Sequence, residues 1–348
     1  MKNILVTGGT GFIGSHTCIS LIEQGYKITI IDSCINSSPL ILKNILSIIK
    51  TGKNSNLITF YKGDIRDKVF LNKVFITSLR ENNPIEAVIH FASLKAIDES
   101  IKSPMLYWDN NVYGSICLFN VMEKFNCRNI VFSSSATIYG NPKSIPIDET
   151  FEINPISPYG QTKAAVENIL RGLHNSNPKK WRIINLRYFN PIGAHESGNL
   201  GEKPLKNAKN LFPILCKVAY EKSGILKIFG KDWPTNDGTA IRDYLHVMDL
   251  ADAHVKSLDY IFRNDPQLIS FNIGTGSGLT VLEIVETFMR INNCEIPYEF
   301  CDRRIGDVPV LIANNLNAIS TLKWHPKRNI SDMCLDGWRW QQKVLNEI

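Results

Sequence analysis

Short, continuous apolar runs alternate with longer stretches of helical periodicity along the first half of the chain. The apolar runs have the length of strands and lack strict polar alternation, which is typical of parallel strands covered on both faces. The predicted strands lie at residues 2–7, 27–31, 57–61, 86–91, 129–133 and 182–186. The predicted helices between them lie at residues 13–24, 68–79, 111–123 and 159–173. This alternation predicts an α/β fold with a doubly wound parallel sheet and helices on both faces.

The second half of the chain, from about residue 188, is richer in loops, because glycines and prolines recur along it. Helical periodicity returns at residues 211–221, 247–261, 281–291 and 335–346. A chain of 348 residues is long enough for two domains. We predict a parallel-sheet domain over residues 1–187 and a smaller C-terminal α/β domain over residues 188–348. Some segments of the second, such as 243–263, are candidates to return to the first.

The composition is that of a globular protein with a sizeable core, at 44% hydrophobic and 21% charged residues. The formal net charge is +6, but the basic residues occur singly or in pairs. Because nucleic-acid surfaces usually carry a basic stripe, we expect no nucleic-acid partner. A modest basic surplus is compatible with a small polyanionic ligand.

The eight cysteines include no C-x-x-C pair, and most lie within apolar segments. This pattern favours a reducing compartment over a disulfide framework. The apolar stretch near the N-terminus is too short for a signal-peptide core, and no run of about 18 apolar residues occurs. We therefore expect a cytoplasmic protein with no membrane partner, and we predict no metal site.

A glycine-rich turn directly follows the first predicted strand. It reads Gly8-Gly9-Thr10-Gly11-Phe12-Ile13-Gly14, with G-x-x-G-x-x-G spacing at Gly8, Gly11 and Gly14, and it leads into a predicted helix. Glycines suit the tight turn, the close approach of a pyrophosphate and helix–strand packing. The helix N-terminus offers free N–H groups to phosphates. Such a turn also occurs without a ligand, but its place within a βαβ unit favours a dinucleotide site in a Rossmann-type sheet.

Two acidic residues after later strands indicate which dinucleotide binds. Asp32 ends the second strand, where a carboxylate accepts hydrogen bonds from the adenosine ribose and repels the additional phosphate of NADP. No Lys or Arg occurs between Ser33 and Leu42 to bind that phosphate, so we predict NAD. Asp64, after the third strand, is a candidate partner for the adenine edge. The alternatives are a strand cap for Asp32 and a turn residue for Asp64.

Tyr159 and Lys163 lie four residues apart at the start of a predicted helix, on one face of it. A phenol with a pKa near ~10 is a poor base at neutral pH, and a neighbouring ammonium favours the phenolate. The same spacing is frequent on helix surfaces. Here, however, a dinucleotide motif precedes it, and the strand at residues 129–133 leads into Ser133-Ser134-Ser135. The combination indicates a catalytic Tyr/Lys pair assisted by a serine.

These motifs resemble those of the extended short-chain dehydrogenase/reductases, and among them the UDP-galactose (UDP-glucose) 4-epimerases. The similarity runs along nearly the whole chain and implies a Rossmann-type fold, bound NAD, a UDP-sugar substrate and a homodimer. Its segments include Val6-Thr7-Gly8-Gly9, Gly14-Ser15-His16-Thr17, Val88-Ile89-His90-Phe91-Ala92, residues 132–140, residues 186–191, Asp237-Gly238-Thr239, Arg242-Asp243-Tyr244, residues 246–252 and Trp338-Arg339-Trp340-Gln341.

Matched residue by residue, the resemblance implies that Tyr159 is the base and that Lys163 tunes it and holds the nicotinamide ribose. It implies that Ser135 hydrogen-bonds the sugar hydroxyl. The residues it places at NAD are Gly8, Gly11, Phe12, Ile13, Gly14, Asp32, Asn36, Ser37, Asp64, Ile65, Phe91, Ala92, Lys95, Asn110, Tyr159, Lys163 and Phe189. Those it places at the UDP-sugar are Lys95, Ser135, Tyr159, Asn190, Asn210, Leu211, Phe229, Arg242, Arg304 and Asp307.

Two of these residues also have a chemical rationale of their own. The guanidinium groups of Arg242 and Arg304 suit the oxygens of a diphosphate, because their planar N–H donors match two acceptors at once. The alternative for either arginine is an ordinary surface charge.

The implied reaction is an epimerisation at C4 of the sugar without net redox change. Tyr159 takes the proton of the 4-hydroxyl, while NAD takes and returns the hydride through a transient 4-keto sugar and stays bound. A sugar-nucleotide 4,6-dehydratase needs an additional acid/base pair, where this chain has Ala136 and Thr137. A 4-epimerase of another UDP-sugar, UDP-xylose/arabinose or a UDP-N-acetylhexosamine, stays open. A non-catalytic NAD-sensing regulator typically lacks the Tyr/Lys pair that this chain keeps.

Two residues depart from the pattern of the 4-epimerases. Ser93, in Phe91-Ala92-Ser93-Leu94-Lys95, stands where glycine is common, beside the expected nicotinamide. Leu311 stands at a pocket position that carries either a Tyr, which excludes an N-acetyl group, or a small residue, which admits one. The preferred sugar is therefore open.

Overall fold

A seven-stranded sheet, parallel throughout, forms the centre of the computed structural model, which describes residues 1–49, 57–203, 210–222, 224–304 and 306–346. Its strand order is β11-β6-β5-β4-β1-β2-β3. The strands are β1 (Asn3–Thr7), β2 (Lys27–Asp32), β3 (Ile58–Lys62), β4 (Ile85–His90), β5 (Asn129–Ser133), β6 (Arg182–Tyr188) and β11 (Leu268–Ile273). Most residues of the central strands are buried, as two covered faces require.

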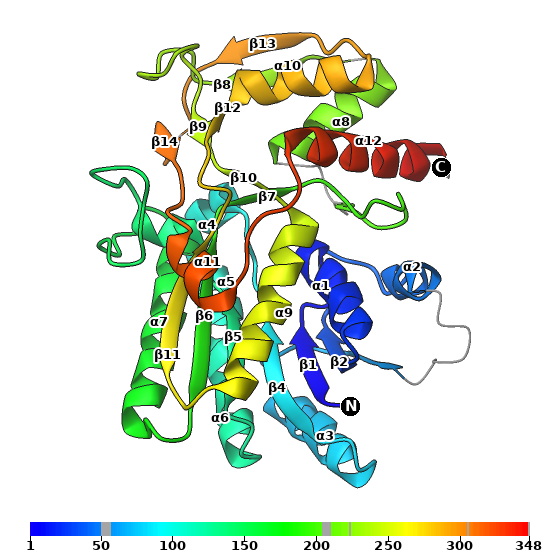
Figure 1. Ribbon diagram of the computed structural model, residues 1–348, viewed down its shortest axis with the longest axis vertical. Coiled ribbons are helices and arrows are strands. Elements are labelled where there is room, and N and C mark those ends of the chain that lie inside the picture. The colour runs from blue at the N-terminus through cyan, green and yellow to red at the C-terminus, as the bar shows by residue number, and fades with distance from the viewer. Residues whose placement is uncertain (50–56, 204–209, 223, 305, 347–348) are drawn as a thin grey trace.

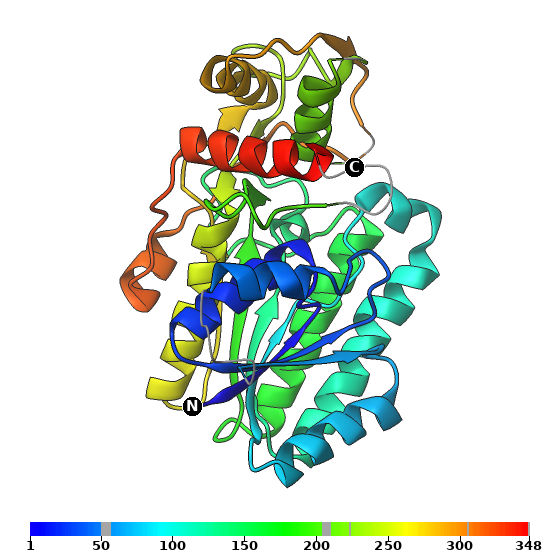
Figure 2. The same ribbon diagram turned by 90° about the vertical axis from the view of Figure 1, so that its right-hand side faces the viewer.

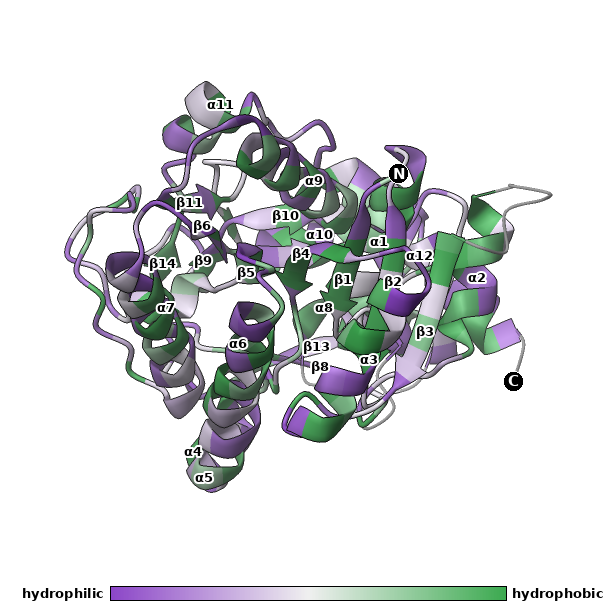
Figure 3. Cartoon of the chain, turned by 90° about the horizontal axis from the view of Figure 1, so that it is seen from below, coloured by the Kyte–Doolittle hydropathy of each residue, from purple (hydrophilic) through white to green (hydrophobic). Residues whose placement is uncertain are grey.

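Helices cover both faces of this sheet (Figures 1 and 2). One hydrophobic cluster joins the sheet to α1 (Phe12–Glu23), α2 (Ile41–Ile48), α9 (Val247–Arg263) and α11 (Leu316–Leu322). A second cluster joins the other face to α3 (Lys68–Arg80), α6 (Gly114–Lys124) and α7 (Pro158–Ser176). Figure 3 shows the apolar colouring of the inner strands between these two helical layers. The fold is thus the doubly wound α/β arrangement that the sequence predicts.

A smaller part of the chain packs above the sheet and has a hydrophobic cluster of its own. Its helices are α8 (Leu211–Glu221), α10 (Val281–Asn292) and α12 (Ile330–Asn346). In Figure 2, α12 (red) crosses between this part and the sheet. Its short strands are β7 (Asn190–Ile192), β8 (Leu226–Phe229), β9 (Ile241–Arg242), β10 (Tyr244–His246), β12 (Leu279–Thr280), β13 (Tyr298–Cys301) and β14 (Val310–Leu311).

Local signals in the sequence explain where several of these helices begin. Asp67 caps α3 by accepting from Phe70 N, and Ser157 caps α7 by accepting from Gly160 N. Thr280 and Glu283 form a reciprocal capping box at the start of α10.

The connection between β4 and α6 contains three short helical elements. They are α4 (Ile97–Lys102), α5 (Pro104–Tyr107) and a π-helical turn, η2 (Trp108–Tyr113).

The six predicted strands and eight predicted helices are confirmed, most of them within two or three residues of the observed ends. Two predicted helices begin elsewhere: the helix predicted at 111–123 begins with the π-helical turn η2 before α6, and the helix predicted at 335–346 begins already at Ile330. The elements that were not predicted include the strand β11, the helices α2, α4, α5 and α11, and the short strands of the smaller part. The polar Ser270 and Asn272 interrupt the apolar run of β11. Asn272 is fully buried, and its side-chain amide accepts from the Tyr139 hydroxyl at 2.7 Å and donates to the Ile147 carbonyl at 2.8 Å.

The second half of the chain contributes three elements to the first. β11 extends the sheet beside β6, α9 packs against α1, and α11 packs against β11 and α9. The division into domains at residues 187 and 188 stays a prediction.

The strand order reverses between β1 and β4. In an open α/β sheet, the crevice at such a reversal, outside the carboxyl ends of the strands, is where ligands bind. Thr7 ends β1, and His90 ends β4, so the turns that follow these two strands face each other there.

Candidate active site

A cavity of about 1120 Å³ lies at the carboxyl edge of the sheet and extends to the smaller part. Gly8 and Asp32 line its sheet end, and Arg242 and Arg304 line its other end. Every residue that the sequence places at NAD or at the UDP-sugar lines this cavity, except Lys163. The predicted site residues, scattered over 300 positions of the sequence, are therefore brought together.

The glycine turn after β1 fits a dinucleotide on steric grounds. A Cβ on Gly14 would lie 2.3 Å from the Gly8 carbonyl oxygen, so a side chain there would clash with the turn. Gly8 has φ of +72°, and a Cβ on it would lie 2.8 Å from Ala92 N. Gly11 caps α1 without a side chain, which leaves the first N–H groups of the helix open to phosphate.

Asp32 is fixed at the adenosine end of the cavity by donors from two loops. Its carboxylate accepts from Thr10 N at 3.0 Å, from Cys34 N at 2.9 Å and from Ser37 Oγ at 3.2 Å. A carboxylate oxygen has two acceptor positions, so Asp32 keeps capacity for the hydroxyls of a ribose. The contact of Asp32 with the ribose stays a prediction.

Asp64 also lines the cavity, but Arg66 engages its carboxylate. Arg66 Nε donates to both carboxylate oxygens at 3.1 Å, and these hydrogen bonds hold the pKa of Asp64 below its usual range. Arg66 also pairs with Asp109. The contact of Asp64 with adenine stays a prediction. Lys43 of α2 also lines the cavity, one position after the segment from Ser33 to Leu42 that lacks Lys and Arg.

Tyr159 and Lys163 are both buried on the first two turns of α7. Lys163 Nζ donates to the Ser133 carbonyl at 2.7 Å and lies 5.8 Å from the centre of the Tyr159 ring. Burial raises the pKa of Tyr159 to about 12, against a lowering contribution from a hydrogen bond with Ser135. Burial also lowers the pKa of Lys163 to about 7, against a raising contribution from Glu167. Burial therefore disfavours both the Tyr159 phenolate and the Lys163 ammonium unless the two opposite charges stabilise each other.

Ser135 presents its hydroxyl at the cavity wall beside Tyr159. It caps the short 3-10 helix η3 (Ala136–Tyr139), accepting from Thr137 N at 3.2 Å and Thr137 Oγ1 at 2.9 Å. Its neighbour Ser134 instead donates to Glu167, which forms a buried ion pair with Arg187 at 2.7 Å. Of the serine run, Ser135 is thus the residue available to a substrate, and Ser134 belongs to the supporting core.

The end of the cavity opposite the glycine turn is cationic. Arg242, on β9, is nearly buried and lies 3.6 Å from Asp307. The guanidinium carbon of Arg304 lies 4.0 Å from the centre of the Phe229 ring. Two guanidinium groups against one carboxylate leave a net positive charge, which suits a diphosphate.

Among the residues that the structure describes, no cluster of His, Cys, Asp or Glu side chains is arranged to hold a metal ion. No helix in that part of the chain is long and apolar enough to cross a membrane.

The sequence pattern of the NAD dependent epimerase/dehydratase family matches residues 4–274 of the chain. The chain belongs to that family. It is 46% identical over 343 residues to the UDP-glucose 4-epimerase of Bacillus subtilis, covering 99% of the chain and 98% of that protein. It is 45% identical to a bifunctional UDP-glucose 4-epimerase and UDP-xylose 4-epimerase of Arabidopsis thaliana, covering 98% of the chain and 96% of that protein.

Solved structures of family members share the fold over the full length. The UDP-glucose 4-epimerase of Bifidobacterium longum, in complex with NAD+ and UDP, matches with a TM-score of 0.92 and 42% identity, and the match covers 100% of both chains. NAD is the cofactor of this epimerase/dehydratase family member.

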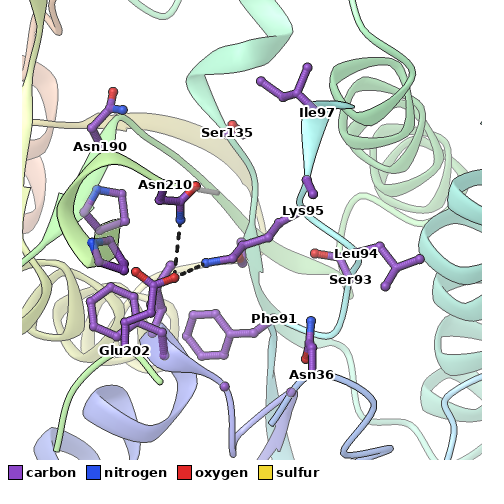
Figure 4. A pocket seen from close by; sticks show the side chains of 18 of the residues that line it. Asn36, Phe91, Ser93, Leu94, Lys95, Ile97, Ser135, Asn190, Glu202 and Asn210 are labelled. Carbon is purple, nitrogen blue, oxygen red and sulfur yellow. Dashed lines mark hydrogen bonds and ion pairs between the residues drawn. The ribbon is translucent and has the colours of Figure 1, made fainter. Parts of the chain in front are cut away.

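One residue of the site has no signal in the sequence of this epimerase/dehydratase. Glu202 Oε1 accepts from Lys95 Nζ at 2.8 Å and from Asn210 Nδ2 at 3.3 Å, and so bridges the cavity (Figure 4). Trp340 Nε1 donates to the Glu202 carbonyl at 3.1 Å, which ties this loop to α12. Lys95 and Asn210 were predicted from the resemblance. The contact that joins them depends on a loop whose course no local pattern specifies.

Proposed function

We propose that this chain interconverts UDP-galactose and UDP-glucose by epimerisation at C4. One observation carries the proposal: Tyr159 and Ser135 line the same cavity as a glycine-lined dinucleotide turn at one end and an arginine pair at the other. A nucleotide sugar held by its diphosphate at Arg242 and Arg304 would place its sugar toward the Tyr159 hydroxyl. The full-length similarity to UDP-glucose 4-epimerases supports the same assignment.

In this proposal, NAD held by the glycine turn and Asp32 supplies an acceptor that takes and returns a hydride, so no net oxidation occurs. Tyr159 accepts the proton of the sugar 4-hydroxyl as a general base, and Ser135 holds that hydroxyl. The arginine pair keeps the diphosphate anchored while the sugar presents its opposite face. The buried position of Tyr159 excludes water from the proton transfer.

Tyr159 needs a positive charge to act near neutral pH. With a pKa of about 12 it is protonated there, and a fall of ~5 units to neutral pH corresponds to ~7 kcal/mol of differential interaction. The Lys163 ammonium, four residues along the same helix face, is the cation that supplies it. Activity should therefore rise with pH as the phenolate forms and fall at higher pH as Lys163 loses its proton.

The substrate assignment is tested by turnover of a panel of UDP-sugars. Purified protein should convert UDP-galactose into UDP-glucose without added reductant, with UDP-xylose and UDP-arabinose turned over more slowly. A preference for the pentose pair would instead make the chain a 4-epimerase of that pair. A protein that binds NAD and turns over none of them would be a regulator.

We predict that the nucleotide released on denaturing the purified protein is NAD and not NADP. Asp32 places a carboxylate where the additional phosphate of NADP would lie, and its repulsion outweighs the exposed Lys43 ammonium on α2. Chromatography of the released nucleotide measures this directly. NADP as the major species would overturn the role given to Asp32.

A second substrate class follows from Leu311 on β14, which lines the cavity and packs in a cluster with Ala136 and Phe189. Leucine is smaller than tyrosine and lacks a hydroxyl, so exclusion of an N-acetyl group should be incomplete. A clash in a packed pocket costs ~1–3 kcal/mol, or roughly ten- to hundred-fold. We predict slow but measurable turnover of UDP-N-acetylglucosamine.

The measurement is kcat/KM for UDP-glucose and UDP-N-acetylglucosamine in the unmodified protein and in Leu311→Tyr. The ratio of kcat/KM for UDP-glucose to kcat/KM for UDP-N-acetylglucosamine should be higher in Leu311→Tyr than in the unmodified protein. The same ratio in both proteins would remove Leu311 from the determinants of specificity.

We also propose that the protein acts in the cytoplasm as a homodimer. Free cysteines support the first point, because a reducing compartment keeps thiols unpaired. For the second, large apolar side chains are exposed on neighbouring helices. They are Ile101 of α4, Met105 and Leu106 of α5, Tyr113 of η2 and Ile116 of α6. Two of these helices, α4 and α5, lie at one outer edge of the molecule (Figure 3). Sedimentation analysis distinguishes a dimer from a monomer.

A further inference from the structure

Ser93, in the loop after β4, contacts Lys163 of the Tyr159/Lys163 pair. Its hydroxyl accepts from Lys163 Nζ at 3.1 Å. On the other side, Lys163 Nζ donates to the Ser133 carbonyl at 2.7 Å. Ser93 lines the cavity (Figure 4), and Lys163 does not. The serine hydroxyl is thus a contact between the buried ammonium and a residue of the cavity wall.

The backbone around Ser93 is held in place relative to α7. Leu94 N donates to Asn111 Oδ1 at 2.8 Å, and Asn111 Nδ2 donates to the Leu94 carbonyl at 3.0 Å. The same amide group donates to Thr162 Oγ1 at 3.0 Å, and Thr162 precedes Lys163 on the helix. The π-helical turn η2 supplies Asn111 at this point. The Ser93–Lys163 contact therefore joins two segments that are already fixed to each other.

The surroundings of Lys163 leave few groups that favour its charged form. Glu167, on the same helix, is engaged by Arg187 of β6. His90 of β4 is fully buried, and burial lowers its pKa to about 3, so it is neutral. Within the described parts of the chain, no carboxylate forms an ion pair with Lys163. Tyr159 of α7 is the remaining titratable neighbour, and the Phe132 ring, with its centre 5.1 Å from Lys163 Nζ, adds a cation–π contact.

Hydrogen-bond acceptors therefore carry much of the stabilisation of this ammonium. A hydroxyl that accepts from an ammonium favours the charged form, because a neutral amine donates more weakly. Ser133 supplies its acceptor through a main-chain carbonyl, which every residue at that position has. The Ser93 acceptor is a side chain, and a glycine would lack it.

We propose that Ser93 is a positioning residue for the Tyr159/Lys163 pair: its hydroxyl orients the Lys163 ammonium and maintains its charge. The inference rests on the proposed epimerase function, since the pair acts there as base and cation. An ammonium held in place favours the Tyr159 phenolate, so loss of the hydroxyl weakens both members of the pair. Ser93 acts through Lys163, and it does not itself take the proton.

The test uses the NAD-loaded protein with Ser93→Gly, Ser93→Ala and Ser93→Thr, and measures kcat and KM for UDP-galactose across pH. In Ser93→Gly and Ser93→Ala the acid limb of the kcat profile should shift to higher pH, and the alkaline limb to lower pH, by roughly half to one pH unit. KM should stay within a few-fold, and Ser93→Thr, which keeps the hydroxyl, should restore the original profile. Unshifted limbs in Ser93→Gly and Ser93→Ala would overturn the proposal.

A second readout needs no turnover. Phenolate formation at Tyr159 is followed by near-ultraviolet absorbance, as the difference between each Ser93 protein and the same protein carrying Tyr159→Phe. The apparent pKa of Tyr159 should be higher in Ser93→Gly and Ser93→Ala than in the unmodified protein, and equal in Ser93→Thr. A protein without epimerase activity that still shows this shift would contradict the proposed function but support the Ser93 contact. An unchanged pKa contradicts the contact itself.

Discussion

Tyr159→Phe should fold, retain NAD and lose epimerase activity by about a hundred- to ten-thousand-fold, the range that a general base contributes. The substitution keeps the buried ring and its edge-on contact with Tyr107, whose ring centre lies 6.5 Å away. It removes only the hydroxyl that accepts the sugar proton. KM should change little, because the arginine pair at the far end of the cavity anchors the substrate.

The measurement is kcat and KM for UDP-galactose together with the NAD content of the purified variant. Tyr298→Phe, on β13 and outside the cavity, is the matched control and should behave like the unmodified protein. Activity of Tyr159→Phe within a few-fold of the unmodified protein would remove Tyr159 from the mechanism.

Lys163→Met should lower kcat by about a hundred-fold or more and move the acid limb of its pH profile upward. Methionine fills the same space without charge, so the fold should persist. The Tyr159 phenolate then forms in a buried site without a cation, which burial alone disfavours. NAD should also bind less tightly, because an ammonium that the resemblance places at the nicotinamide ribose is gone.

The double variant Tyr159→Phe with Lys163→Met sharpens this prediction. When two residues act as one unit, replacing both lowers kcat little more than the more damaging single substitution does. Lys256→Met, an exposed lysine of α9, controls for loss of a lysine as such. If the fold-loss of kcat in the double variant equals the product of the two single fold-losses, Lys163 acts independently of Tyr159.

The sequence predicts the parts of the site that local geometry dictates. A Cβ on Gly8 or Gly14 would clash within the turn, so the glycine spacing, together with its place in a βαβ unit, indicates the dinucleotide end. Ser157 and Pro158 place the start of α7, and helix periodicity then puts Tyr159 and Lys163 on one face. The central strands follow from their apolar runs, because both faces of the sheet are covered.

The remaining features depend on tertiary contacts that no local pattern encodes. The strand β11 was not predicted, because Ser270 and Asn272 interrupt its apolar run. The hydrogen bonds that satisfy the buried Asn272 amide exist only in the folded chain. Glu202 reaches Lys95 and Asn210 only because Trp340 holds its loop across the cavity. Ser93 stands out in the sequence as a departure from a family pattern, but its contact with Lys163 exists only in the folded chain.

Transient oxidation at C4 with return of the same hydride is tested with UDP-galactose carrying deuterium at C4. The purified protein is incubated with it in ordinary water without added nucleotide, and the product is analysed by mass spectrometry and NMR. We expect UDP-glucose with deuterium retained at C4, because the proposed mechanism holds the hydride on bound NAD and returns it to the opposite face. UDP-glucose with hydrogen at C4, or no UDP-glucose at all, would contradict it.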